Sequence, residues 1–221
     1  MNIPISSSDY NPHNNIKALN VLFSIYDIDM KPVNLLDNKI TVLNLLLHNL
    51  IEKHGEAFSD CAVIFENALK ANNTIFWCGN GGSAAESSHL AVELIGRFKN
   101  NRKSLPSLSL NADTSAITCI ANDFGYDEIF ARQLEGLGKK GDVLIVLSSS
   151  GKSENILRAL RKAKEMGITS IALLGKGGGE AVALSDFAIV IESEETARIQ
   201  EMHLLLGHTL CEYAEIALGI A

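Results

Sequence analysis

Two pairs of polar side chains have the types and the spacing of a metal-assisted site. His89 and Glu93 lie four residues apart in a helix-like stretch, so their side chains share one face of that helix. Gln200 and His208 lie eight residues apart in the last helix-like stretch, roughly 80° apart around its axis. Each pair alone is a weak signal, because such pairs are more often surface contacts. Together they offer two imidazoles, a carboxylate and an amide oxygen, a plausible ligand set for a borderline metal such as zinc.

A glycine turn, Gly79-Asn80-Gly81-Gly82-Ser83, precedes the helix that carries His89. It fits the loose dinucleotide fingerprint G-x-G-x-x-A, but residues 97–106 lack the acidic residue that would hold a ribose. A nucleotide site is therefore disfavoured. Ser83 and Glu86 form an S-x-x-E capping box, which predicts an ordinary helix start. That box leaves the glycines unexplained, since glycine is needed where φ is positive or where a ligand approaches the main chain.

The loop LSSSGKSEN (147–155) is the stronger candidate for an anion site. Glu86 places a carboxylate in the first turn after the glycine turn, which makes that helix start less attractive to phosphate. The second loop follows a buried strand, precedes an amphipathic helix and offers four hydroxyls, on Ser148, Ser149, Ser150 and Ser153. It is not a Walker A motif, because Val146 stands where a glycine is required. An ordinary serine-rich cap is the alternative, but four hydroxyls exceed what one cap needs, which favours phosphate.

The elements that must position these residues alternate along the chain. Apolar steps of three and four residues from Asn34 to Ala71 predict two helices, broken near Gly55. Short strands are then predicted at 74–78, 105–110, 142–148, 170–175 and 187–193, and the apolar run at 142–148 suits a strand buried on both faces. Helices are expected at 83–98, 113–122, 127–138, 153–167 and 196–218, and GKGGGE (175–180) is interpreted as a turn. This alternation predicts an α/β fold with a central parallel sheet and helices on both faces.

Composition limits the functions that remain. The 221 residues are 47% hydrophobic and 20% charged, as expected for one large domain or one domain with an appendage. A net charge of −7 argues against a nucleic-acid surface. Four cysteines without CxxC spacing indicate reduced, mostly buried thiols in a cytoplasmic protein. Residues 1–15 lack the features of a signal peptide, and no apolar run approaches membrane-spanning length.

Four segments, taken in order, resemble the phosphoheptose isomerase family of the sugar-isomerase (SIS) fold. They are CGNGGSAAESSHLAVELIGRF, ANDFGYDEIFARQ, LSSSGKS and ARIQEMHLLLGH. The resemblance runs from about residue 36 to the C-terminus. It implies a flavodoxin-like three-layer fold with an N-terminal helical segment, in which 34–221 form a single SIS domain. Residues 1–33 are then an extension that we expect to be flexible.

The resemblance also implies roles for individual residues. The four metal-associated positions of the family correspond to His89, Glu93, Gln200 and His208, which implies one zinc ion per subunit. Glu93 becomes the candidate base and His208 the candidate acid or partner base, although one carboxylate cannot be a tight ligand and a free base at the same moment. Implied substrate contacts are Asn80, Gly81, Gly82, Ser83, Glu93, Asn122, Asp123, Ser148, Ser149, Ser150, Ser153 and Gln200. A homotetramer with active sites at subunit interfaces is implied as well.

The implied activity is an aldose–ketose isomerisation. It would convert D-sedoheptulose 7-phosphate to D-glycero-D-manno-heptose 7-phosphate through an enediol(ate), the first step of nucleotide-activated heptose biosynthesis. Two alternatives stay open: a non-enzymatic SIS adaptor that binds the replication initiator, and an isomerase or sensor of another phosphosugar. The adaptor relative carries other residues at the positions of Glu93 and His208, so their presence here favours the enzyme. Whether the heptose feeds lipopolysaccharide, capsule or another glycan is not decided by the sequence.

Overall fold

The computed structural model describes residues 31–220, and the chain divides into two compact units, 1–45 and 46–221. The described part of the first unit is the beginning of one long helix, α2 (Pro32–Lys70). The second unit contains the rest of α2 and every later element. The extension expected at residues 1–33 lies outside the described residues, apart from its last three.

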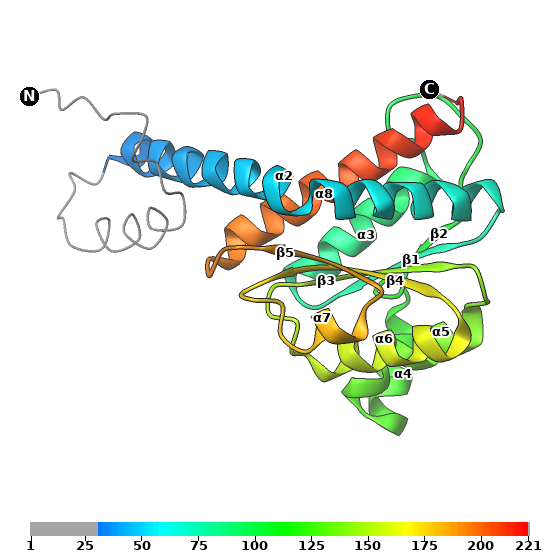
Figure 1. The fold of residues 1–221 in the computed structure, drawn as a ribbon. Coiled ribbons are helices and arrows are strands. Elements are labelled where there is room, and N and C mark those ends of the chain that lie inside the picture. Colours follow the sequence, from blue (N-terminus) through cyan, green and yellow to red (C-terminus); the bar gives the residue numbers. More distant parts are fainter. Residues whose placement is uncertain (1–30, 221) are drawn as a thin grey trace, which may run out of the picture. The chain divides into compact units, whose positions relative to one another are not determined.

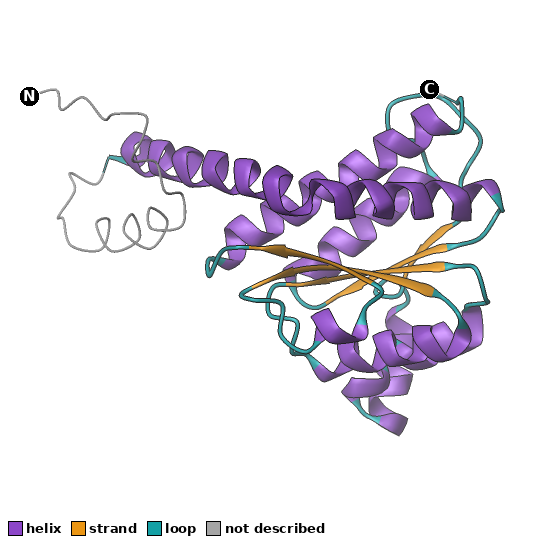
Figure 2. Ribbon diagram, viewed as in Figure 1, coloured by secondary structure: helices purple, strands orange, loops and turns teal. Residues whose placement is uncertain are grey.

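A five-stranded parallel sheet forms the centre of the second unit (Figures 1 and 2). The strand order is β2-β1-β3-β4-β5, which is the flavodoxin order, and all four pairings are parallel. The strands are β1 (Ile75–Gly79), β2 (Ser107–Ser109), β3 (Val143–Ser148), β4 (Thr169–Gly175) and β5 (Phe187–Ile191). Every residue of β3 is buried, as its unbroken apolar run predicts. The predicted parallel α/β sheet is therefore confirmed.

Helices cover both faces of this sheet (Figure 1). One face carries α3 (Gly82–Ile95), α8 (Thr196–Ala217) and the Leu46–Lys70 part of α2, where Phe65 packs edge-on against Trp77 of β1. The other face carries α4 (Thr114–Phe124), η1 (Tyr126–Glu128), α5 (Ala131–Leu137), α6 (Glu154–Met166) and α7 (Ala181–Leu184), over a core that includes Phe76 and Phe130. Within residues 31–220, no helix combines the length and apolar character needed to span a bilayer.

Two predicted elements differ from the structure, and one observed element was not predicted. The helix break near Gly55 is wrong, because α2 is continuous from Pro32 to Lys70. A glycine inside a helix costs only about 1 kcal/mol, which burial of side chains such as Phe65 on the same helix offsets. The single helix expected at 127–138 is instead the short turn η1 followed by α5. Part of the sequence after the 175–180 turn forms α7, which was not predicted.

The four cysteines are free thiols, as predicted, and three of them are buried. Burial raises the pKa of Cys61 and that of Cys211 to about 12. These thiols stay protonated at neutral pH and therefore act as small apolar core residues. Only Cys119, on α4, is exposed.

Candidate active site

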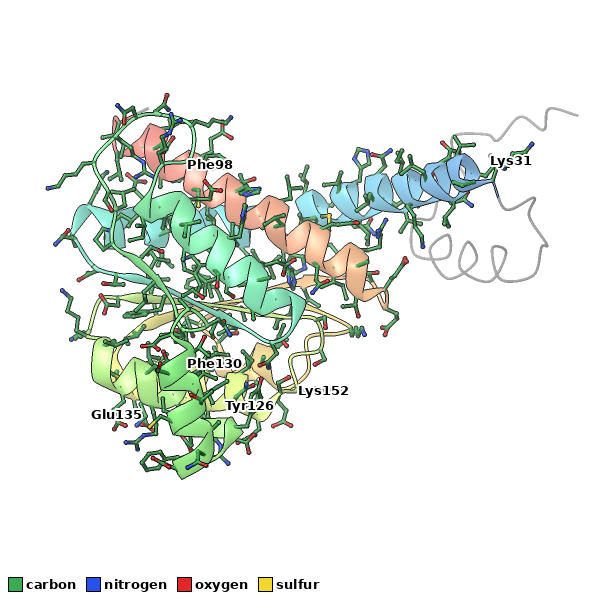
Figure 3. The ribbon with its side chains drawn as sticks, turned by 180° about the vertical axis from the view of Figure 1, so that it is seen from behind. Lys31, Phe98, Tyr126, Phe130, Glu135 and Lys152 are labelled. Atoms are coloured by element: carbon green, nitrogen blue, oxygen red, sulfur yellow. The ribbon has the colours of Figure 1, made fainter. Side chains whose placement is uncertain are left out.

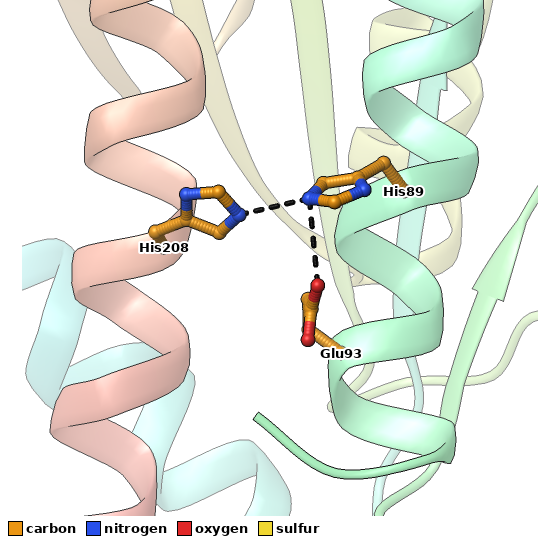
Figure 4. A group of neighbouring side chains, drawn as sticks. All are labelled: His89, Glu93 and His208. Carbon is orange, nitrogen blue, oxygen red and sulfur yellow. Dashed lines mark hydrogen bonds and ion pairs between the residues drawn. The ribbon is translucent and has the colours of Figure 1, made fainter. Parts of the chain in front are cut away.

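Helices α3 and α8 bring His89, Glu93 and His208 together. The two helices run side by side in the same direction, because Gly82 faces Gln200 at their start and Leu90 faces Gly207 further along. The Nε2 atoms of His89 and His208 lie 2.9 Å apart, and His89 Nε2 lies 3.4 Å from Glu93 Oε1 (Figure 4). His89 and Glu93 on α3 thus lie beside His208 on α8, which follows more than a hundred positions later in the chain.

This group could hold a metal ion such as zinc. One donor atom from each of the three residues lies within 4.8 Å of the others. The pKa of His208 is lowered by burial and by the neighbouring His89, against the opposite pull of Glu93, so the neutral imidazole that binds metals is favoured. Two imidazole nitrogens and one carboxylate fit a tetrahedral ion that keeps one position open. The side chain of His89 is 47% exposed, so the group opens to the surface of the subunit.

Gln200, the fourth predicted metal residue, lies at the glycine turn of its own chain. A Cβ built on Gly82 would sit 2.3 Å from Gln200 Nε2, so the amide lies directly against the start of α3. Gly82 precedes His89 by seven residues, or about 10 Å of helix at 1.5 Å per residue. The structure therefore groups three of the four predicted residues and places Gln200 beside the predicted substrate contact Gly82.

The glycines of the turn are explained by contacts within the protein. Gly81 has a φ of 58°, in the left-handed region. A Cβ on Gly79 would lie 2.6 Å from the carbonyl oxygen of Ser83, and one on Gly82 would strike the Gln200 amide. The capping-box prediction is wrong: Gly81 is the N-cap, and α3 has no side-chain cap. Ser83 is a buried residue inside the helix, and its carbonyl accepts a hydrogen bond from Ser87 Oγ.

Glu86 is held in an unusual environment one turn into α3. Burial raises the pKa of its carboxyl to about 7, although a hydrogen bond with Ser83 acts in the opposite direction. Its Oε2 is buried and has no hydrogen-bond partner among the described residues. Glu86 is thus readily protonated near neutral pH, so its carboxylate offers the helix start less negative charge than the sequence suggests.

Asn80 connects the glycine turn to the loop that follows β3. Its amide and that of Asn155 form a reciprocal pair, with Nδ2–Oδ1 distances of 2.9 and 2.8 Å. The hydroxyl of Tyr126 donates to the same Asn80 oxygen at 3.0 Å. A second amide, Asn111, bonds both the N–H and the carbonyl of Gly79. These contacts fix the turn between β1 and α3 against three neighbouring segments, at Asn111, Tyr126 and Asn155.

The serine loop leads from β3 to the start of α6. Ser148 is buried, and its Oγ accepts from the N–H of Gly151 at 3.0 Å. Ser153 is the N-cap of α6 but makes no side-chain capping bond, so its hydroxyl is not used in the way an ordinary cap would use it. Ser149 and Ser150 are partly exposed. With the N–H groups at the start of a 13-residue helix, these hydroxyls can bind an anion.

The glycine cluster at 175–180 packs against the backbone of the serine loop. It forms the expected turn after β4, and a Cβ on Gly179 would lie 2.6 Å from the carbonyl oxygen of Ser150 and 2.7 Å from that of Gly151. The N–H of Ala181 donates to Gly151 at 3.1 Å. The turn therefore fixes the backbone that presents the serine hydroxyls.

Asn122 and Asp123 lie exposed at the end of α4 and contact each other. Asn122 Nδ2 donates to Asp123 Oδ1 at 2.7 Å. In the described part of the chain, the same segment reaches the glycine turn through Tyr126, three residues after Asp123. That Asn122 and Asp123 contact the substrate stays a prediction, as do the roles assigned to the other site residues.

Comparison with known proteins decides the family. The SIS domain family matches residues 40–175 of this chain. The phosphoheptose isomerase of Nitratiruptor sp. is 56% identical over 150 residues, which cover 68% of this chain and 80% of that relative. The chain belongs to the phosphoheptose isomerase family. This assignment confirms the predicted family and the predicted enzyme class, an isomerase.

Solved structures of phosphoheptose isomerases agree in fold. The enzyme from Neisseria gonorrhoeae has a TM-score of 0.78 at 33% identity, over 84% of this chain and all of that one. The enzyme from Francisella tularensis has a TM-score of 0.80 at 29% identity, over 85% of this chain and all of that one. The predicted three-layer SIS fold is confirmed by these likenesses together with the strand order.

Two contacts of this phosphoheptose isomerase family member were not found from its sequence. Asn155 and Tyr126 both hold Asn80, yet neither was singled out. Tyr126 lies inside ANDFGYDEIFARQ, which carries the family resemblance, and Asn155 is the last residue of the loop LSSSGKSEN, two positions after the resembling segment LSSSGKS. An asparagine directly behind a serine-rich loop was the available signal, but nothing local indicates a partner 75 residues away.

Proposed function

We propose that this chain interconverts D-sedoheptulose 7-phosphate and D-glycero-D-manno-heptose 7-phosphate. The observation that carries the proposal is the convergence of His89, Glu93 and His208 from two helices in a member of this family. A carboxylate beside two imidazoles suits proton transfer at a sugar carbonyl. The hydroxyl-lined loop after β3 suits the phosphate at the other end of the substrate.

The serine loop supplies the phosphate end. Lys152 is exposed next to the hydroxyls and adds one positive charge. Glu154, in the first turn of α6, would oppose an anion, but its carboxylate is bonded to Arg158 at 2.9 Å and to Arg161 at 3.1 Å. The helix start therefore keeps its attraction for a phosphate dianion.

Proton transfer is assigned to the helix pair. Interconverting a ketose and an aldose moves one proton between C1 and C2 and another between the two oxygens, through an enediol(ate). Glu93 takes the carbon-bound proton and returns it to the neighbouring carbon. His208 exchanges the oxygen-bound proton, and its lowered pKa favours the neutral form, which can accept that proton.

One zinc ion per subunit is part of the proposal. His89, Glu93 and His208 have the donor atoms to hold it, with Gln200 as the fourth predicted ligand. Bound zinc would polarise the carbonyl and hydroxyl oxygens of the sugar. Glu93 serves as base only while it is not tightly bound to the metal, so its two roles belong to different moments of the reaction.

The active sites are proposed to be completed in a homotetramer. Apolar side chains near the His89 group are exposed: Val92 is 58% and Ile95 47% exposed on α3, and Leu205 is 44% exposed on α8. Such faces are usually covered by a partner in oligomeric proteins. Light scattering should give a mass near four subunits. Mixing unfolded His208→Ala and Ser150→Ala chains and refolding them together should restore activity if the sites combine residues of two copies.

The place of the reaction follows from its substrate. We propose that the protein works in the cytoplasm, because its cysteines are free thiols and phosphorylated sugars are made there. The product would feed nucleotide-activated heptose biosynthesis.

The decisive experiment is an isomerase assay with sedoheptulose 7-phosphate, with and without chelator. Wild type should lose turnover with the chelator and regain it with zinc. Glu93→Gln and His208→Ala should each lower turnover by about 100-fold or more. Glu165→Gln, which removes an exposed carboxylate on α6, is the matched control. Undiminished turnover in both site variants would refute the assignment, and a panel of other phosphosugars tests the substrate.

A further inference from the structure

A buried ion pair connects α8, the helix that carries His208, to the segment that follows α3. Arg102 Nε donates to Glu215 Oε1 at 2.7 Å, and the two side chains are 2% and 1% exposed. Arg102 belongs to the segment that leads from α3 to β2, and Glu215 lies on α8, two helical turns after His208. The reaction as proposed above makes no use of this pair.

Every strong donor around this carboxylate comes from the same segment. Glu215 accepts the backbone N–H groups of Phe98, Lys99 and Asn100 at 3.1–3.3 Å. Burial alone would raise the pKa of Glu215, but the hydrogen bonds from Arg102 and these N–H groups outweigh it and lower the pKa. The carboxylate is therefore charged and holds residues 98–102 against α8.

Arg102 also holds the end of α3. Its Nη2 donates to the carbonyl oxygen of Glu93 at 2.7 Å, and its Nη1 donates to that of Leu94 at 2.9 Å. These carbonyls lie in the last turn of α3, which ends at Ile95. One guanidinium thus connects the backbone of Glu93 to the helix that carries His208.

Phe98 extends from this fixed segment onto the ring of His208. The two rings are stacked, with centroids 5.4 Å apart and planes inclined by 25°. Figure 3 shows Phe98 on the segment beside α8. The second torsion of a histidine side chain is broad and roughly two-fold, so the ring needs contacts to fix the direction of its nitrogens. Phe98 supplies such a contact on the ring face, while His89 meets the ring at Nε2.

We propose that Phe98 is a positioning residue that orients the His208 imidazole, and that the buried Arg102–Glu215 pair holds Phe98 in place. The inference rests on the proposed function, since it explains how His208 is directed at the reacting group. The role requires a flat ring at position 98 and does not require Phe98 to touch the substrate.

The test compares two substitutions at Phe98, which is only partly buried. Phe98→Tyr keeps a flat ring, and Phe98→Leu keeps the apolar volume without one. Phe187→Leu, on the edge strand β5, is the matched control. If the Leu variant is not folded by circular dichroism, Phe98→Met replaces it. The measurements are kcat and KM for sedoheptulose 7-phosphate, and zinc affinity by competition with a chromophoric chelator.

In Phe98→Leu we expect kcat and zinc affinity to fall by about tenfold each, with KM within about twofold of wild type. Phe98→Tyr and Phe187→Leu should stay within about twofold in all three measurements. Wild-type kcat and zinc affinity in Phe98→Leu would overturn the inference, and so would equal losses in the Leu and Tyr variants. Wild type without isomerase activity would refute the proposed function instead, and the zinc measurement would still decide the role of Phe98.

Discussion

The glycine turn and the serine loop are held by polar contacts between neighbouring segments, whereas the group of His89, Glu93 and His208 lies on two helices and opens to the surface. At the first region, Asn80 is fixed by Asn155 and Tyr126, and Gly179 packs against the serine loop. At the second, His89 is 47% exposed. The region that would bind phosphate is thus held by contacts within the chain, while the region that would move protons is more open and has Phe98 stacked on His208.

The largest effect on stability is expected at Gly79. Alanine there would place a Cβ 2.6 Å from the Ser83 carbonyl oxygen, so the backbone of the turn must move. We expect Gly79→Ala to lower the free energy of unfolding by about 3 kcal/mol, measured in urea. Gly55→Ala is the control, because nothing lies within 4 Å of that position, and it should add about 1 kcal/mol of stability. Equal stability of the two variants would contradict the packed turn.

At the group of His89, Glu93 and His208 we expect the opposite result. A substitution there should reduce activity and leave stability nearly unchanged. His89→Ala removes a half-exposed ring and should change the free energy of unfolding by less than about 0.5 kcal/mol. Turnover of sedoheptulose 7-phosphate should fall on the order of 100-fold, and zinc binding should weaken. A large loss of stability would contradict the comparison, because it would show that the His89 group contributes to the stability of the fold as the glycine turn does.

A smaller effect is expected for phosphate binding at Ser153. Its hydroxyl makes no capping bond, so Ser153→Ala should leave stability unchanged. Loss of one hydrogen bond to a charged phosphate should raise KM about tenfold with kcat nearly unchanged. Ser59→Ala, which removes an exposed hydroxyl bonded within α2, is the control. A fall in kcat with constant KM would move Ser153 from binding to chemistry.

The smallest effect concerns Glu86, which lies on α3 between the two regions. Its pKa is raised to about 7, so the protonated form stabilises the fold at low pH, and this stability is lost as the pH rises through 7. Glu86→Gln cannot ionise and should be more stable than wild type by roughly 1 kcal/mol at pH 8, a value reduced for partial exposure. The gain should vanish near pH 4, and Glu165→Gln should show no such pH dependence. Urea unfolding at both pH values measures it.

The centre of the sheet was predictable because β1 and β3 are short, almost wholly apolar runs. VLIVLS in β3 needs burial on both faces, and this requirement alone implies a parallel sheet covered by helices. The break near Gly55 was wrong because one glycine is a weak local signal that tertiary packing overrides. The start of α3 was misplaced because the capping box matches the sequence but the fold makes Gly81 the N-cap and Ser83 the second residue of the helix.

The candidate site was predictable only in part. Helical spacing indicates that His89 and Glu93 share a face, and family resemblance supplies His208. Neither indicates that Gln200 packs on Gly82 or that Phe98 stacks on His208. Such contacts depend on how two helices lie side by side, and residues a hundred positions apart carry no local signal of it.

The reciprocal amides of Asn80 and Asn155 have a consequence for altering substrate range. Each side chain supplies the donor and the acceptor that the other needs, and Asn155 is 2% exposed. A change at Asn80 leaves the buried amide of Asn155 without its partner, at a cost of about 1–3 kcal/mol, and a change at Asn155 removes two of the bonds that hold Asn80. Directed evolution that varies single codons would discard both positions, whereas a library that randomises the two together can reach new pairings.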